Sequence, residues 1–159
     1  YDFVDGNEQI ELFPVNYTND PFIIAQNYRM ISINSCLEVD FMGQVASESI
    51  GMRQFSGIGG QVDFVRGASI AREGKSIIAM PSTAAGGTIS RIKPFLTPGA
   101  AVSTTRNDVN YIVTEYGIAR LKGRTLQHRA EDLIRIAHPD FRPQLIEEYE
   151  RRFMSKFQA

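Results

Sequence analysis

The sequence contains few of the residues that bind metals or form disulfide bonds, with one cysteine and two histidines in 159 residues. A single cysteine excludes a disulfide bond within the chain and is typical of a reducing compartment. Because Cys36 lies inside an apolar run, we interpret it as a buried structural thiol. Neither His128 nor His138 has a second histidine, a cysteine or a carboxylate at zinc-ligand spacing, so the sequence predicts no metal centre.

Signals for several kinds of partner are also missing. The net charge is −1 and the isoelectric point about 6.2, so the sequence lacks the basic character that nucleic acid or an anionic membrane attracts. No apolar run approaches the length of about 18 residues that a membrane-spanning helix needs, and the first residues lack the plan of a signal peptide. We therefore expect a cytoplasmic protein that recognises a small molecule or another protein surface. Because the chain starts at Tyr1, and its first residues resemble the middle of a domain, we also expect a fragment of a longer protein.

The sequence has the apolar content of one globular domain, with 43% hydrophobic residues. Residues 30–35 and 37–41 alternate apolar and polar side chains, which predicts either two strand segments joined near Cys36 or one long bent strand. Residues 77–80 form a continuous apolar run, typical of a strand buried on both faces of a parallel sheet. Residues 109–115 predict another core strand. Helices are predicted from the apolar spacing after the glycines at 57–60 and in two C-terminal segments, where Thr125 caps the first and the second begins near Asp140.

Other elements are predicted from shorter patterns. Residues 10–15 resemble the end of a strand, and Asn19 or Asp20 before Pro21 is typical of a helix start. Residues 82–88 are predicted to form a flexible loop. Two further strands are expected in residues 90–96 and 101–105, separated by a turn at Pro98-Gly99.

The most informative stretch is a glycine turn, Gly57-Ile58-Gly59-Gly60, which is followed at once by the helical pattern. The N–H groups at a helix start carry partial positive charge, and glycine lets a ligand approach the backbone. The spacing matches neither a dinucleotide-binding fingerprint nor a P-loop, and no nucleophile elbow is present. A turn that holds an oxyanion and a plain strand-to-helix corner without a ligand both remain open at this point. Among the carboxylates, Glu115 is best placed to act as a nucleophile, although its position favours a hydrogen-bonded or capping role.

Five stretches in colinear order resemble the C-terminal domain of the acetyl-CoA hydrolase/transferase family, among the class I CoA-transferases. They are SINSCLEVD at 32–40, GQV at 43–45, FSGIGGQVDF at 55–64, SIIAMPST at 76–83 and VTEYGIA at 113–119. The resemblance covers nearly the whole chain. It implies an α/β fold with an open, mostly parallel sheet flanked by helices, as the C-terminal domain of a two-domain protein.

The resemblance also implies a function. Members transfer coenzyme A between a short-chain acyl-CoA and a free carboxylate, here expected to be 4-hydroxybutyrate or butyrate and acetate, through a glutamyl-CoA thioester. The nucleophilic glutamate lies upstream of the matched region, so the chain is expected to lack it. Coenzyme A is then a substrate, and no permanent cofactor is expected. The chain's own N-terminal domain is the expected partner, and a homo-oligomer is allowed.

For individual positions, the resemblance implies an oxyanion loop at Gly59 and Gly60. The residues that it implies near coenzyme A are Asn19, Gly57, Gln61, Met80, Pro81, Ser82 and Arg106. An acetyl-CoA hydrolase, in which water resolves the thioester, is the alternative within the family. A non-catalytic coenzyme A-binding or interaction module is the alternative outside it.

Overall fold

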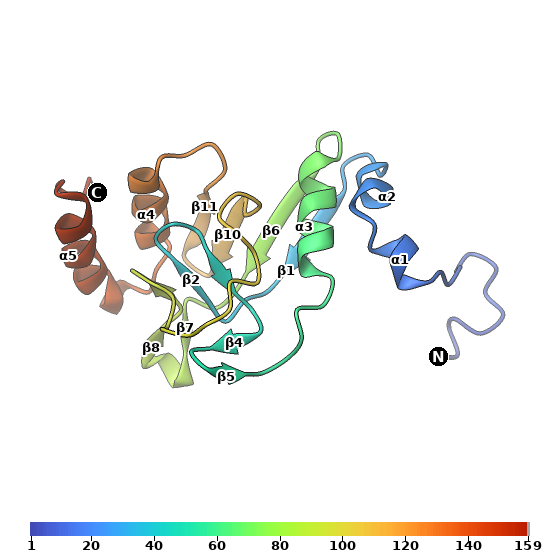
Figure 1. Ribbon diagram of the computed structural model, residues 1–159, viewed down its shortest axis with the longest axis horizontal. Helices are drawn as coiled ribbons and strands as arrows, with labels where there is room; N and C mark the ends of the chain where they lie inside the picture. Colours follow the sequence, from blue (N-terminus) through green and yellow to red (C-terminus); the bar gives the residue numbers. More distant parts are fainter. Residues whose placement is uncertain (159) are drawn as a thin grey trace.

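The structure, a computed structural model, describes residues 1–158 as helices packed around two main sheets (Figure 1). Its helices are α1 (Val15–Thr18), α2 (Pro21–Ala25), α3 (Gln61–Ile70), α4 (Leu126–Arg135) and α5 (Arg142–Phe153), with short 3-10 turns η1 (Ala85–Gly87) and η2 (Pro139–Phe141). Its strands are β1 (Ile31–Asn34), β2 (Glu38–Asp40), β3 (Val45–Ala46), β4 (Ser49–Ile50), β5 (Arg53–Gln54), β6 (Lys75–Ala79), β7 (Thr83–Ala84), β8 (Ile89–Ser90), β9 (Ile92–Lys93), β10 (Tyr111–Thr114) and β11 (Gly117–Arg120).

The larger sheet has the strand order β1-β6-β10-β11. β1, β6 and β10 are parallel, with Ile33 opposite Ile77 and Ile77 opposite Tyr111. β11 returns antiparallel to β10 after a two-residue loop at Glu115 and Tyr116. This arrangement confirms the predicted α/β fold with an open, mostly parallel sheet.

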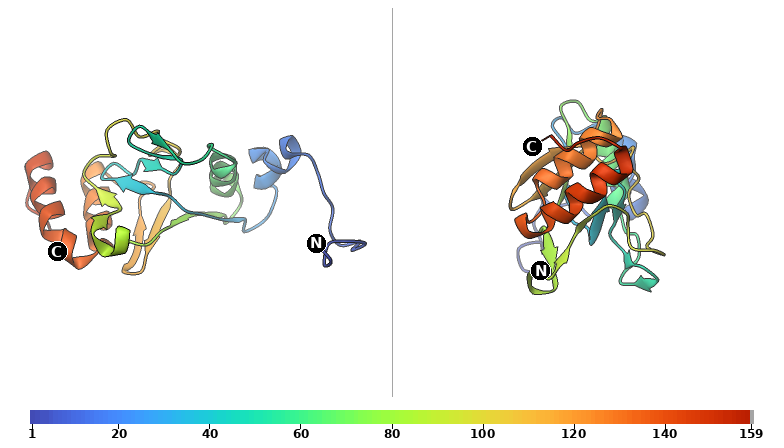
Figure 2. Two further views of the ribbon diagram at one scale, coloured as in Figure 1. Left: turned by 90° about the horizontal axis from the view of Figure 1, so that it is seen from below. Right: turned by 90° about the vertical axis from the view of Figure 1, so that its left-hand side faces the viewer.

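The hydrophobic core lies on one side of the larger sheet. It joins side chains of that sheet to residues of α3, α4 and the smaller sheet β3-β2-β9, which lie on the same side (Figure 2, left). Val39, Val65, Ile78, Ile112 and Leu133 are all fully buried there. α5 packs on α4, so the C-terminal helix forms an outer layer over this core.

The predicted helix starts are confirmed by their caps. The side chain of Asp20 accepts a hydrogen bond from the Phe22 N–H at 2.8 Å, with Pro21 as the first residue of α2. Thr125 accepts from the His128 N–H at 3.2 Å and starts α4. Both caps satisfy N–H groups that a helix leaves without an internal partner.

Three of the shorter predictions are wrong. Residues 10–15 form no strand: they are irregular up to Pro14, and α1 begins at Val15. Residues 82–88 are not a plain loop, because β7 pairs with β8 around η1. Residues 101–105 contribute one isolated bridge, between Val45 and Thr104, because a turn from Thr105 ends the pairing.

The strand predicted in residues 90–96 is divided. Ser90 uses its hydroxyl to hydrogen bond the carbonyl and the N–H of Ile92, and such local side-chain bonds compete with a sheet ladder. β8 and β9 therefore belong to different sheets.

The prediction that residues 77–80 are buried on both faces of the sheet is half correct. Ser76 and Ile78 are buried against the core, whereas Ile77 and Ala79 are partly exposed on the opposite face. Within residues 1–158, helices cover one face of the larger sheet.

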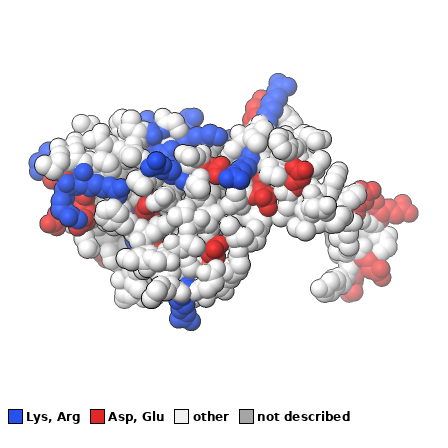
Figure 3. All heavy atoms as spheres, viewed as in Figure 1, with Lys and Arg blue, Asp and Glu red and all other residues white. Residues whose placement is uncertain are grey.

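The first fourteen residues extend away from the rest of the molecule (Figures 1 and 2). Acidic side chains gather on this segment in the space-filling view (Figure 3), in agreement with Asp2, Asp5, Glu8 and Glu11 in the sequence. No helix in residues 1–158 combines the length and the hydrophobicity needed to cross a bilayer.

Candidate functional site

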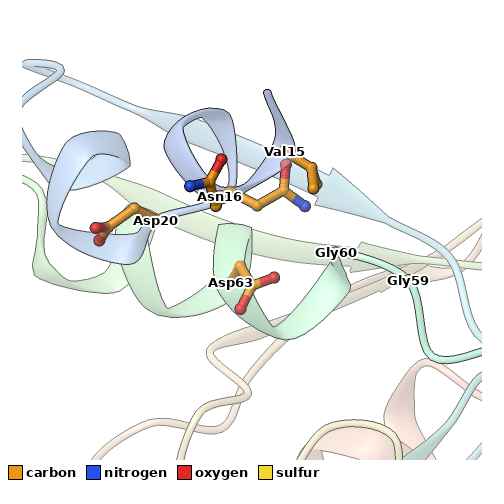
Figure 4. Close-up of a pocket in the computed structure, with 7 residues that line it drawn as sticks. Val15, Asn16, Asp20, Gly59, Gly60 and Asp63 are labelled. Carbon is orange, nitrogen blue, oxygen red and sulfur yellow. The ribbon is translucent and has the colours of Figure 1, made fainter. Parts of the chain in front are cut away.

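A pocket of about 450 Å³ lies where the start of α3 meets α1 and the residue that precedes α2 (Figure 4). Its lining residues are Val15, Asn16, Asn19, Asp20, Gly59, Gly60 and Asp63. The glycine turn therefore opens into a cavity. Asn19, which lies 41 positions before Gly60 in the sequence, lines the same cavity.

The two glycines of this pocket are needed for different reasons. Gly59 has a φ of +59°, in the left-handed region that favours glycine. Gly60 has a φ of −93°, which other residues adopt, but a Cβ atom there would lie 2.2 Å from Nδ2 of Asn19. Gly60 thus lets the Asn19 side chain touch the backbone at the start of α3.

The contact orients the Asn19 amide. The Thr18 hydroxyl donates a hydrogen bond to Oδ1 of Asn19 at 3.2 Å, which leaves Nδ2 on the side of Gly60. The N–H groups of the first turn of α3 begin at the same point, and the N-cap residue Gly60 has no side chain to pair with them. The pocket therefore places an amide donor beside the positive end of a ten-residue helix.

Two carboxylates limit what this pocket can hold. Asp63, in the first turn of α3, and Asp20, the cap of α2, both line it. They repel a phosphate, which carries its charge in the ground state, more than a neutral carbonyl oxygen that becomes negative during a reaction. Of the ligands considered for the glycine turn, the carbonyl oxygen of an acyl group suits this environment best.

A second cleft, of about 480 Å³, lies at the carboxyl ends of β6 and β10. It is lined by Ala79, Met80, Pro81, Val113, Thr114 and Glu115. α3 also begins at this edge, because it runs back to the start of β6, which follows it in the chain (Figure 1). Ligands of open α/β sheets bind outside the carboxyl ends of the strands, so both cavities lie at the edge where a site is expected.

Glu115 fixes the loop that follows β6. Its carboxylate accepts hydrogen bonds from the N–H of Ser82 at 2.8 Å and from the Ser82 hydroxyl at 2.6 Å. These bonds hold the pKa of Glu115 below its usual value, with the Ser82 side chain as the main cause. A carboxylate committed in this way is a hydrogen-bonded anchor, one of the two roles that its sequence position left open.

The remaining predicted site residues are not all brought together. Gln61 directs its amide to Oγ1 of Thr104 at 3.0 Å, and the Ser82 side chain is buried against Glu115. Arg106 is exposed on another loop and contacts Sδ of Met42 at 3.5 Å. Gly57 is exposed and is absent from the linings of both cavities described above.

Several carboxylates and the single thiol have structural partners. Buried Glu38 accepts from Lys93 at 2.6 Å, and Asp40 accepts from the N–H groups of Met42 and Gln44. Burial raises the pKa of Cys36 to about 12, which confirms the interpretation as a structural thiol. In residues 1–158, no three histidine, cysteine or acidic side chains gather as a metal would require.

Sequence reasoning missed four lining residues of the first pocket, namely Val15, Asn16, Asp20 and Asp63. Asp63 lies three positions after Gly60 and therefore returns to the same face of α3, which the helical period could have revealed. Asn16 belongs to α1, and nothing in the sequence indicated that this short helix would pack beside the glycine turn.

The acetyl-CoA hydrolase/transferase C-terminal domain matches residues 1–149 of the chain. The chain belongs to the acetyl-CoA hydrolase/transferase family. It is 59% identical to the 4-hydroxybutyrate coenzyme A transferase of Clostridium kluyveri, over 96% of this chain and 36% of that protein. It is 48% identical to the butyryl-CoA:acetate CoA-transferase of Anaerostipes caccae, over 95% of this chain and 34% of that protein.

Solved structures agree with these comparisons. The crystal structure of 4-hydroxybutyrate CoA-transferase from Porphyromonas gingivalis superposes with a TM-score of 0.80 at 54% identity, and the match covers 96% of this chain and 34% of that one. The chain spans about one third of the length of these relatives in the acetyl-CoA hydrolase/transferase family.

Proposed function

We propose that this chain is the C-terminal domain of a CoA-transferase that moves coenzyme A between a short-chain acyl-CoA and acetate. The acyl group is 4-hydroxybutyryl or butyryl. Membership of the family and the activities named for the relatives support this proposal.

The proposed reaction passes through a glutamyl-CoA thioester. A glutamate carboxylate attacks the acyl-CoA carbonyl and expels the thiolate of coenzyme A, leaving an anhydride. The thiolate then attacks the glutamyl carbonyl of this anhydride, and the free acid departs. Acetate reverses these steps and leaves as acetyl-CoA, so the energy of the thioester is retained. The glutamate belongs to a part of the polypeptide that precedes this chain, and the isolated domain is therefore inactive.

The observation that carries the proposal is the contact between Asn19 and the backbone at Gly60. Each attack makes a tetrahedral intermediate whose oxygen becomes negative. The N–H groups at Gly59 and Gly60, with Nδ2 of Asn19, are the donors for this oxygen in our proposal. Donors fixed before the reaction stabilise such charge without reorganisation.

The other positions bind the coenzyme A substrate in this proposal. Met80 and Pro81, which line the second cleft, and the adjacent Ser82 form one wall of its channel, and Gly57, Gln61 and Arg106 are the further residues that contact coenzyme A in this proposal. The N-terminal domain supplies the opposite wall, so the active site lies between the domains.

The experiment is an assay of the full-length protein with butyryl-CoA and acetate. Appearance of acetyl-CoA in step with loss of butyryl-CoA is the expected result, and 4-hydroxybutyryl-CoA should also serve as donor. Loss of the thioester without acetyl-CoA would instead identify an acetyl-CoA hydrolase, in which water resolves the glutamyl thioester. Loss of neither substrate would favour a non-catalytic module.

A further inference from the structure

The first pocket contains one amide side chain that has no partner within residues 1–158. Asn16 and Asn19 are the lining residues with an amide, and the Asn19 amide already contacts Thr18 and Gly60. The Asn16 side chain is exposed and forms no hydrogen bond with the described residues. The remaining lining residues are a valine, two glycines and two aspartates, and an ionised carboxylate accepts hydrogen bonds without donating any. Asn16 is therefore the uncommitted donor of this cavity.

The Asn16 amide lies close to the proposed oxyanion donors. Asn16 precedes Asn19 by three positions, and the N–H of Asn19 donates to the carbonyl of Val15 at 2.9 Å, so the turn between them is helical. Side chains three positions apart on a helical turn share one face, with Cβ atoms about 5–6 Å apart. Figure 4 shows Asn16 on this turn and Asp63 on the facing turn of α3. Asn16 and Asn19 thus belong to the same wall of the pocket.

The acyl chain of a bound acyl-CoA points toward this wall. With the carbonyl oxygen held at Asn19 and Gly60, the thioester carbon has two further substituents, the sulfur of coenzyme A and the acyl chain. Coenzyme A extends from the second cleft at β6 and β10, whereas α1 lies on the other side of α3 from these strands (Figures 1 and 2). The acyl chain therefore enters the first pocket. The inference rests in this respect on the proposed function.

The length of a 4-hydroxybutyryl group fits the spacing of the two asparagines. Its terminal oxygen is four bonds from the carbonyl carbon, or about 5 Å in an extended chain with bonds of about 1.5 Å. This distance matches the separation expected between the side chains of Asn19 and Asn16. Val15 also lines the pocket and is 68% exposed, so it offers aliphatic surface to the methylene groups of the chain.

We propose that Asn16 is a specificity-determining residue, which donates a hydrogen bond to the terminal hydroxyl of a 4-hydroxybutyryl group. A hydroxyl donates one hydrogen bond and accepts two. The carboxylates of Asp20 and Asp63 line the same pocket and can accept its proton. A butyryl group ends in a methyl group and offers nothing to these partners. The pocket therefore favours 4-hydroxybutyryl over butyryl, the two acyl groups that the proposed function leaves open.

A competition assay of the full-length protein tests this inference. Equal concentrations of 4-hydroxybutyryl-CoA and butyryl-CoA are mixed with acetate, and the amounts of the two released acids give the ratio of their kcat/KM values. Asn16→Ala removes the amide, and Asn16→Asp removes the hydrogen-bond donor while keeping the size of the side chain. Gln127→Ala is the matched control, because it removes an exposed amide from α4. The melting temperature of each variant shows that it is folded.

We expect both Asn16 variants to lower the ratio of 4-hydroxybutyryl-CoA to butyryl-CoA use by about 3- to 10-fold, the value of one hydrogen bond between neutral groups. Gln127→Ala should keep the ratio of the parent protein. An unchanged ratio in Asn16→Ala, or an equal loss of rate with both substrates, would overturn the inference. A ratio lowered in Asn16→Ala but kept in Asn16→Asp would make Oδ1 the partner of the hydroxyl and would overturn the donor role.

The same assay separates this inference from the proposed function. An unchanged ratio in variants that still form acetyl-CoA refutes the role of Asn16 alone. A folded parent protein that forms no acetyl-CoA from either substrate refutes the proposed transferase function, and the role of Asn16 with it.

Discussion

Replacement of Gly60 by alanine separates a catalytic role of the glycine turn from a structural one. The added Cβ would lie 2.2 Å from Nδ2 and 3.3 Å from Cγ of Asn19, so the asparagine side chain has to leave its position. The backbone at Gly60, with φ −93° and ψ 10°, accepts alanine, and the displaced group is the end of a flexible side chain. Unfolding should therefore become easier by no more than about 1 kcal/mol.

The effect on turnover should be much larger. Loss of one oxyanion donor lowers kcat by about 100- to 1000-fold, or about 3–4 kcal/mol. We expect Gly60→Ala to reduce formation of acetyl-CoA from butyryl-CoA and acetate by this factor in the full-length protein. Urea unfolding of the same preparation measures the stability change.

Two neighbouring glycines provide matched controls. A Cβ at Gly57 or at Gly59 would meet no described atom within 4 Å, but Gly59 has a φ of +59°. Gly57→Ala should leave the stability unchanged, whereas Gly59→Ala should cost about 1 kcal/mol of backbone strain without displacing Asn19. If Gly60→Ala turns over as fast as the parent protein, the turn is a plain helix start and the reasoning is refuted.

Three further predictions concern the surroundings of the site. Glu115→Gln should lower the free energy of unfolding by about 1 kcal/mol near pH 7 by weakening the bonds from Ser82. The folded-state pKa of Glu115 is lowered, so its contribution to stability is present above the unfolded pKa of about 4.3 and is lost as the pH falls through the folded pKa. Urea unfolding near pH 3 should therefore show a smaller stability difference between Glu115→Gln and the parent protein. Lys93→Met removes the ionic partner of buried Glu38 and should lower the free energy of unfolding in urea by about 3 kcal/mol. A decrease below about 1 kcal/mol would contradict the importance of this ion pair. Cys36 of the folded protein should react with a disulfide reagent at about pH 8 far more slowly than an ordinary thiol, because it is buried and its raised pKa leaves little thiolate, and a rate equal to that of a free thiol would show that it is accessible.

Elements specified by local chemistry could be predicted from the sequence. Helices begin at three places where the local sequence predicts a start. Asp20 and Thr125 accept hydrogen bonds from helix N–H groups, whereas the glycines before Gln61 leave such groups without a side-chain cap. The apolar run at 77–80 likewise predicted the central parallel strand.

Elements that depend on distant partners were predicted less well. β11 was missed, although the loop at Glu115 and Tyr116 and the Gly117 that follows are typical of a hairpin. Residues 101–105 have the composition of a strand but find one bridging partner, which no local pattern reveals. The pocket could be anticipated only in part for the same reason, since the contact of Asn19 with Gly60 depends on how α1 and α2 pack on α3.

That packing depends on a third glycine. A Cβ at Gly67 would lie 2.4 Å from Cγ2 and 2.5 Å from Cβ of Ile24, so α2 rests directly on the backbone of α3. Gly67 is two helical turns, about 10 Å, from Gly60, and α2 begins two residues after Asn19. Even the smallest side chain at position 67 would lift α2 and carry Asn19 with it. The width of the pocket is therefore adjustable from a position that no ligand reaches, by a substitution that leaves every residue of its lining unchanged.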